Sequence, residues 1–259
     1  MRHPHGLFGW IDLTTTDVEA ARAFYSGLFG WDSVDMPTPM GPSYTMFSIG
    51  GNVVAGMGPQ PPAMAASGVP SMWNSYVIVA DLDAVLEATG PAGGTVPMGA
   101  MDVMTQGRMA MIADPSGAVV GLWQPGDHQG ADVFNSPGAL TWNELMTRDL
   151  EAATAFYGSV FGWRWEESGQ PGYLLAMLDA KDTDDKSNCG AMVMPAEVPA
   201  EVPNYWSAYI SVSDVDASVA RATGLGGTVF LPVMAGGPGR FAGITDPTGA
   251  MMMLGEFGG

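Results

Sequence analysis

Two acidic side chains are candidates for proton-transfer chemistry, Asp12 and Glu144. Each follows a tryptophan by two positions, Trp10 in one case and Trp142 in the other. Because alternate side chains of a β-strand share a face, the carboxylate and the indole of each pair should lie together. A carboxylate beside an indole is poorly solvated, which raises its pKa toward the range of a general acid or base. We therefore predict that Asp12 and Glu144 are catalytic.

Tyrosines on later strands are the predicted partners of these carboxylates. Tyr76 and Tyr209 occupy matching places, and a phenol O–H can donate to an oxyanion that develops on a substrate. We predict a catalytic role for both. The structural alternative is that the carboxylates only accept hydrogen bonds from backbone or tyrosine groups and so hold the sheet together.

The remaining candidates describe an apolar pocket with few polar groups. The same alternation adds side chains that we predict to bind substrate beside Trp10 and Trp142, namely Asn74, Ser207, Trp123 and Met253. A pocket with one tryptophan, one carboxylate and one tyrosine suits an aromatic or polycyclic small molecule. The alternative for Trp10 and Trp142 is that they fill the cavity without stacking on a ligand.

Two arginines recur at equivalent places, Arg108 and Arg240. Each could bind a carboxylate or a phenolate of the substrate, because guanidinium pairs well with both. The alternative is a salt bridge to Asp114 or Asp246, and we favour it.

The elements that position these residues are duplicated. Asp17 opens the pattern Asp-x-x-x-x-x-x-Phe-Tyr, and Asp149 opens the same pattern 132 positions further on. The Asp-Pro-x-Gly sequences at 114–117 and 246–249 keep that offset. The copy length is that of a whole domain rather than of a solenoid repeat, so we predict two domains.

Each half divides again into two quarters with one order of elements. In the first quarter a strand at 8–14 precedes a helix that Thr16 or Asp17 caps and Gly30 ends, and three strands follow. We predict an α+β fold of four βαβββ modules in two domains with cup-shaped mixed sheets. The predicted limits are 6–125 and 138–257, with a linker at 126–137. Whether a cup forms within each half or from quarters one and four stays open.

The charge balance excludes several partners. Nine basic and 27 acidic residues give a net charge of −18, which repels phosphate backbones and anionic lipids. The apolar runs are far shorter than a membrane span. We predict neither nucleic acid nor membrane as a partner, and a monomer or homodimer. The single cysteine, Cys189, agrees with a cytoplasmic protein.

The order of elements and the two repeated motifs resemble the vicinal oxygen chelate superfamily. That group contains glyoxalase I, bleomycin-resistance proteins, fosfomycin-resistance enzymes and extradiol dioxygenases, so the resemblance implies two glyoxalase-like domains over roughly residues 6–257. Gly-Arg before the penultimate strand and Trp-Asn at 73–74 resemble tandem glyoxalase-like proteins of actinobacteria. These include a mycobacterial culture-filtrate antigen and proteins named hydroxylases. The Trp-Asn-Glu pattern at 142–144 favours a functional role for Glu144.

The superfamily's metal ligands do not carry over to this sequence. The resemblance places them seven residues before the Asp of each helix and seven after the Asp of Asp-Pro-x-Gly. Those positions hold Trp10, Asn74, Trp142, Ser207, Gly121 and Met253. The three histidines lie in the N-terminal tip and the linker, so a histidine-rich metal centre is not expected. We predict no metal and no cofactor.

The expected function is therefore a metal-independent enzyme. It would catalyse a lyase, isomerase or cyclase step on an aromatic or carbonyl compound of secondary metabolism, with one active cup and one structural cup. The alternative is a binding or resistance protein that sequesters an aromatic antibiotic without chemistry. A weaker alternative is a metal-dependent glyoxalase- or dioxygenase-like enzyme whose ion is held by Asp12 or Glu144 and water.

Overall fold

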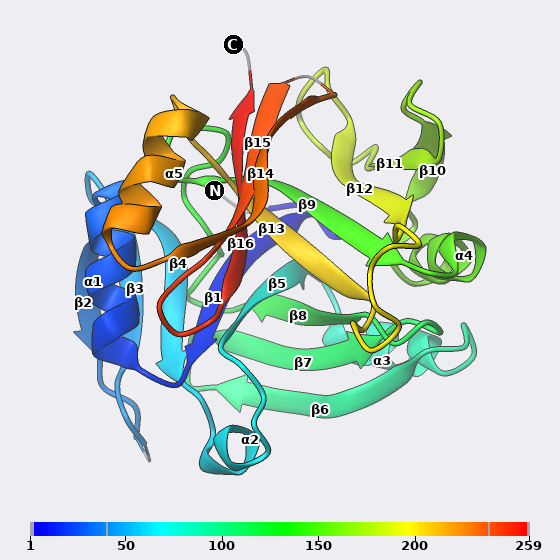
Figure 1. Ribbon diagram of the computed structural model, residues 1–259. Coiled ribbons are helices and arrows are strands. Elements are labelled where there is room, and N and C mark those ends of the chain that lie inside the picture. Colours follow the sequence, from blue (N-terminus) through cyan, green and yellow to red (C-terminus); the bar gives the residue numbers. More distant parts are fainter. Residues whose placement is uncertain (1–2, 40, 238, 258–259) are drawn as a thin grey trace. The chain divides into compact units, whose positions relative to one another are not determined.

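The computed structural model describes residues 3–39, 41–237 and 239–257 (Figure 1). The first half contains β1 (Phe8–Thr15), α1 (Val18–Phe29), β2 (Asp32–Met36), β3 (Tyr44–Ile49), β4 (Asn52–Pro59), α2 (Pro62–Ala66), β5 (Met72–Ile78), α3 (Leu82–Thr89), β6 (Thr95–Val103), β7 (Gly107–Ala113) and β8 (Val119–Pro125). The second half contains β9 (Leu140–Thr147), α4 (Leu150–Phe161), β10 (Arg164–Glu167), β11 (Tyr173–Met177), β12 (Ser187–Val193), β13 (Tyr205–Ser211), α5 (Val215–Gly224), β14 (Thr228–Gly236), β15 (Gly239–Thr245) and β16 (Met251–Phe257). The predicted order of one strand, one helix and three strands is confirmed four times.

Aspartate side chains begin the four longer helices. Asp17 accepts a hydrogen bond from the backbone N–H of Ala20, which satisfies one of the donors left open in the first turn. The same contact recurs at Asp81, Asp149 and Asp214. Helices α1 and α4 end at Gly30 and Gly162, whose φ angles of 71° and 72° favour glycine.

Each half forms one eight-stranded mixed sheet. The strand order is β2-β3-β4-β1-β5-β8-β7-β6 in the first sheet and β10-β11-β12-β9-β13-β16-β15-β14 in the second. In the first sheet β1 pairs parallel with β4, whereas β2, β3 and β4 pair antiparallel. The predicted α+β class with mixed sheets is therefore confirmed.

Side-chain packing divides the chain into two compact units that differ from the halves. Unit 1 consists of Met1–Trp10, Ser75–Gly130 and Trp142–Ser207, and unit 2 of Ile11–Asn74, Ala131–Thr141 and Ala208–Gly259. Helix α3 packs with α4 in unit 1, and α1 packs with α5 in unit 2. Strand pairing therefore joins quarters one and two, whereas helix packing joins quarters one and four. The domain limits 6–125 and 138–257 stay a prediction.

In unit 2 the two repeated motifs meet in a buried hydrogen-bond chain. The indole Nε1 of Trp73 donates to the Tyr25 hydroxyl at 2.7 Å, and Tyr25 donates to Oδ2 of Asp246 at 3.0 Å. The other carboxylate oxygen, Oδ1, accepts the backbone N–H groups of Thr248 and Ala250. The Phe-Tyr and Asp-Pro-x-Gly motifs thus tie helix α1 to the turn before β16.

Unit 1 repeats this arrangement with its own copies of the motifs. Trp206 Nε1 donates to the Tyr157 hydroxyl at 2.8 Å, and Asp114 Oδ1 accepts the backbone N–H groups of Ser116 and Ala118. Burial, and after it the charge of Asp114, raises the pKa of Tyr157 well above its ordinary value. These motif residues therefore stabilise the fold.

Candidate functional site

In unit 1 the candidate residues lie on the sheet face opposite helix α4. Leu145 of β9 is buried in the core with the residues of α4. Because side chains alternate along a strand, Trp142, Glu144 and Met146 point to the other face, where each is partly exposed. Glu144 stands opposite Gly190 of β12. The alternation predicted for β9 therefore places the carboxylate and the indole on one accessible face.

Tyr173 of β11 reaches this carboxylate across Gly190. A Cβ added at position 190 would collide with the Tyr173 hydroxyl, so only glycine leaves room for the phenol to lie over β12. The Trp142 indole Nε1 donates to the Tyr173 hydroxyl at 2.9 Å. The Tyr173 hydroxyl is in turn hydrogen-bonded to Glu144. Unit 1 thus contains a chain from indole to phenol to carboxylate.

The phenols of this site stay protonated at neutral pH. Burial raises the pKa of Tyr173, and the charge of Glu144 raises it further. The pKa of Tyr205 on β13 is raised by the same two causes, with burial the larger. A phenol whose oxygen already accepts the indole N–H and whose pKa is raised acts as a donor. Tyr173 is therefore placed to donate to Glu144 or to an oxygen of a ligand.

Unit 2 holds the related carboxylate in a more polar setting. The Tyr44 hydroxyl of β3 donates to Oδ2 of Asp12 at 3.2 Å, and Asn74 Nδ2 donates to Oδ1 at 2.9 Å. Asn74 also donates to the Thr14 hydroxyl at 3.0 Å. Tyr44 lies over Gly56, where a Cβ would collide with its hydroxyl, as at Gly190 in the other unit. Both oxygens of Asp12 are thus held by neutral donors.

The two sites differ in the side chain that lies two residues after the carboxylate, on the same face of the strand. Thr14 stands opposite Gly58 in unit 2, whereas Met146 stands opposite Met192 in unit 1. This position is therefore apolar beside Glu144 and polar beside Asp12.

Sequence reasoning missed the tyrosines that contact the carboxylates. It selected Tyr76 and Tyr209 by alternation, but Tyr44 and Tyr173 make the contacts described above. A signal was present, because both follow a Pro-x sequence at the start of the third strand of their module. Tyr76 is buried opposite Gly121, and Tyr209 is buried opposite Met253. The catalytic roles of Tyr76 and Tyr209 stay predictions.

Trp10 and Trp123 pack around a residue of the linker in unit 1. The ring of Trp10 lies 4.4 Å from the His128 ring, centroid to centroid, and that of Trp123 lies 5.6 Å from it. Trp123 Nε1 also donates to the His128 carbonyl oxygen at 3.0 Å. Only 3% of Trp10 and 5% of Trp123 is exposed. This placement agrees with the cavity-filling alternative for Trp10, and ligand binding by either residue stays a prediction.

The remaining predicted residues are spread over several strands. Ser207 is partly exposed on β13, and Met253 is buried on β16. Arg108 pairs with Asp83 at 2.9 Å, and Arg240 pairs with Asp216 at 2.7 Å, each beside the first turn of a helix. The alternative partners, Asp114 and Asp246, were wrong: both carboxylates are buried, and the Oδ1 atom of each accepts the N–H groups of its own turn.

The donor set does not fit the superfamily's metal. The positions that would supply ligands carry indole, amide, hydroxyl and thioether groups or no side chain, which are poor ligands for a divalent ion bound by oxygen or imidazole. Asp12 faces an N–H and an O–H donor, whose positive ends oppose a cation. Within residues 3–39, 41–237 and 239–257, no group of three or more His, Cys, Asp or Glu side chains could hold a metal ion.

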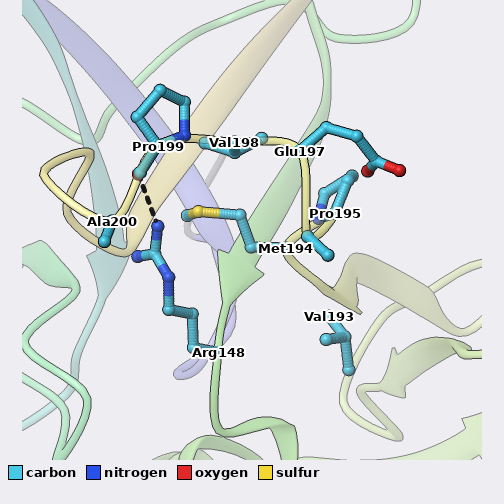
Figure 2. Close-up of a pocket in the computed structure, with 9 residues that line it drawn as sticks. Arg148, Val193, Met194, Pro195, Glu197, Val198, Pro199 and Ala200 are labelled. Carbon is cyan, nitrogen blue, oxygen red and sulfur yellow. Dashed lines mark hydrogen bonds between the residues drawn. The ribbon is translucent and has the colours of Figure 1, made fainter.

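A depression of about 410 Å³ lies on the connector between β12 and β13 in unit 1 (Figure 2). Arg148 donates to the carbonyl oxygens of Pro199 and Val202 at 2.8 and 2.7 Å and so holds this connector against the end of β9. Its lining consists of Arg148 and the segment 193–200, and it includes none of the predicted site residues. We assign it no catalytic role.

None of the helices in the described ranges is long and apolar enough to cross a membrane.

Both halves match models of one family. Residues 7–122 match the Glyoxalase/Bleomycin resistance protein/Dioxygenase superfamily, and residues 142–254 match a glyoxalase-like domain. The chain is 42% identical over 255 residues to "Putative glyoxylase CFP32" of Mycobacterium tuberculosis, which covers 96% of this chain and 94% of that protein. It is 36% identical over 259 residues to "Anthracycline biosynthesis protein DauV" of Streptomyces sp., with coverage of 96% and 92%.

The fold is also that of a solved enzyme. The Mn(II)-bound glyoxalase from Novosphingobium aromaticivorans superposes with a TM-score of 0.65 over 97% of this chain and 82% of that one. At 12% identity this likeness shows the fold alone.

Proposed function

Because this chain belongs to the glyoxalase/bleomycin resistance protein/dioxygenase superfamily, we propose that it binds a small aromatic or carbonyl-bearing metabolite and transforms it without a metal. One observation carries the proposal. In both units a tyrosine crosses a glycine to reach a carboxylate on the first strand of its module. A relative is named for anthracycline biosynthesis, which supports a substrate from secondary metabolism.

The chemistry is a proton transfer at Glu144. Its carboxylate takes a proton from a carbon or oxygen of the substrate and returns it to another atom, as in a lyase, isomerase or cyclase step. Tyr173 turns its O–H from Glu144 to the substrate oxygen on which negative charge develops. Trp142 keeps the phenol in place through its 2.9 Å hydrogen bond. We assign the active site to unit 1, and Asp12 of unit 2 takes no part in the proton transfer.

A test begins with native mass spectrometry of the protein purified from its source, which should reveal a co-purified aromatic compound. With that compound as substrate, Glu144→Gln should abolish turnover, and the variant should still bind the compound. Asp12→Asn is the matched control and should retain turnover. Full turnover by the Glu144→Gln variant would disprove the acid–base role.

The second candidate function is binding without chemistry. The polar setting of Asp12, whose oxygens are both hydrogen-bonded, favours it for unit 2. Binding of this kind in unit 2 would weaken when Asn74, which donates to Asp12, becomes Ala, and the ligand would be released unchanged. Product analysis after prolonged incubation with the recovered ligand separates this function from catalysis.

We also propose that the protein is cytoplasmic. It should be a monomer or homodimer and should not bind nucleic acid. The net charge of −18 supports the absence of nucleic-acid binding. Cys189 is buried and free, which fits a reducing compartment.

A further inference from the structure

Three aromatic side chains surround the carboxylate in unit 1. Trp142 precedes Glu144 by two positions on β9, Tyr173 reaches it from β11, and Tyr205 begins β13, the strand next to β9. Trp206 is buried in the core on the helix side, so alternation turns Tyr205 to the same face as Glu144. The hydrogen bond between Trp142 and Tyr173 holds these two rings relative to each other.

The rest of this face is mostly apolar, and the polar Ser207 lies two residues after Tyr205 on β13. Met146 stands opposite Met192, and Leu175 stands opposite Gly190 in line with Glu144. Met146, Met192 and Leu175 are all partly exposed. A ligand on this face would therefore meet aromatic rings, apolar side chains, the Ser207 hydroxyl and the Glu144 carboxylate.

We propose that the Glu144 site selects an aromatic ligand that carries a protonated amine. Aromatic faces attract a cation through the ring quadrupole, and a nearby carboxylate supplies the opposite charge. The inference rests on the proposed binding of an aromatic ligand in unit 1. The net charge of −18 raises the local concentration of cations and so supports the same class of ligand.

The proposal is consistent with the proton transfer assigned to Glu144. A cation beside the carboxylate favours its ionised form, which is the form that accepts a proton. Unit 2 provides an internal comparison, because both carboxylate oxygens of Asp12 accept hydrogen bonds from neutral donors, Tyr44 and Asn74. The Asp12 site should therefore lack the selectivity for an aromatic amine.

Three probes with one ring system test the charge alone: 1-naphthylmethylamine, 1-naphthalenemethanol and 1-naphthoate. Their affinities for the full chain would be measured by isothermal titration calorimetry at pH 7.5 in 20 and 500 mM salt. The amine should bind about tenfold more tightly than the alcohol, and the naphthoate should bind most weakly. Glu144→Gln should remove the preference for the amine while the affinity for the alcohol is kept. Asp12→Asn should leave the preference intact.

The other outcomes separate this inference from the proposed function. Equal affinity for amine and alcohol would overturn the inference and leave aromatic binding in place, whereas binding of none of the three probes would overturn both. A preference that salt abolishes and Glu144→Gln does not change would come from net charge alone and would also overturn it. Retained binding of the alcohol shows that the Glu144→Gln variant is folded.

Discussion

At the scale of single residues, the polar side chains of this protein divide into buried ones that hold the fold and half-exposed ones that form the candidate site. Tyr25 is fully buried between Trp73 and Asp246, and its hydrogen bonds to these two residues link parts of unit 2 that are distant in sequence. Tyr44 makes a similar contact with Asp12, but on a face that solvent reaches. The same phenol–carboxylate contact therefore has different consequences at the two places.

Replacement of Tyr25 by Phe tests this difference. The variant leaves a buried Asp246 oxygen and the partly buried Trp73 N–H without their partner, so the free energy of unfolding should fall by about 2–3 kcal/mol. Tyr44→Phe is the matched control, and it should cost about 1 kcal/mol or less because water can replace its hydroxyl. Urea denaturation followed by circular dichroism measures both. Equal losses would show that burial does not distinguish these tyrosines.

At the scale of elements, a glycine in an inner strand decides what can lie above the sheet. Gly190 and Gly56 have ordinary backbone angles, so their value lies in the space they leave for the tyrosine of the neighbouring strand. The antiparallel pairing of β11 with β12 brings Tyr173 over Gly190. Any side chain at position 190 would fill the space that the Tyr173 hydroxyl occupies.

Gly190→Ala should displace the Tyr173 hydroxyl from both Trp142 and Glu144. Because only the end of a side chain must move, the cost in stability should stay near 1 kcal/mol. The indole loses its acceptor, so the tryptophan fluorescence maximum should shift and the preference for naphthylmethylamine should fall. Gly99→Ala is the control, since nothing lies within 4 Å of a Cβ there. Unchanged probe binding by Gly190→Ala would contradict the placement of Tyr173 in the site.

The connectors between modules are held by different side chains in the two copies. Gln60 donates to the carbonyls of Val69 and Pro70 in the first copy, whereas Arg148 performs this role on the connector of the second (Figure 2). Arg148→Ala should cost about 1 kcal/mol, since the contacts are exposed, and should speed proteolysis within residues 194–204. Arg164→Ala is the control because it removes only the surface ion pairs with Glu166 and Asp179. Mass spectrometry of early fragments locates the cleavage, and an unchanged cleavage rate would refute the anchoring role.

At the scale of the whole molecule, each compact unit buries a tyrosine whose pKa a nearby aspartate helps to raise, Tyr25 in unit 2 and Tyr157 in unit 1. Burial is the larger cause that raises the pKa of Tyr25 and of Tyr157, and the nearby aspartate is the next. A folded-state pKa above the unfolded value of about 10 means that the native protein holds these protons more tightly. Their contribution to stability is therefore complete below pH 10 and is lost as the pH rises further.

The protein should consequently lose stability steeply above about pH 10. Urea denaturation at intervals from pH 8 to 11.5 measures the slope. The double variant Tyr25→Phe, Tyr157→Phe should be less stable at pH 8 but should show a shallower decline above pH 10, because the titrating groups are gone. An equal slope in both proteins would exclude these tyrosines as its cause.

The sequence by itself determined the features that depend on short-range geometry. Helix starts follow from an aspartate that reaches a backbone N–H three residues on, and this contact needs no other part of the chain. The duplication and the order of strands and helices are likewise read along the chain. Alternation within β9 sufficed to put Trp142 and Glu144 on one face of the sheet.

Only the tertiary structure decided which side chains meet across strands and helices. Tyr173 reaches Glu144 because of the register between β11, β12 and β9, which strand alternation does not specify. Arg108 forms its ion pair with Asp83 and not with Asp114, because the packing of helix α3 brings Asp83 within reach. The pairing of quarter one with quarter four through α1 and α5 arises from apolar packing between segments distant in sequence. Short-range geometry thus determines the helices and strands, and long-range packing determines which side chains contact one another in the site.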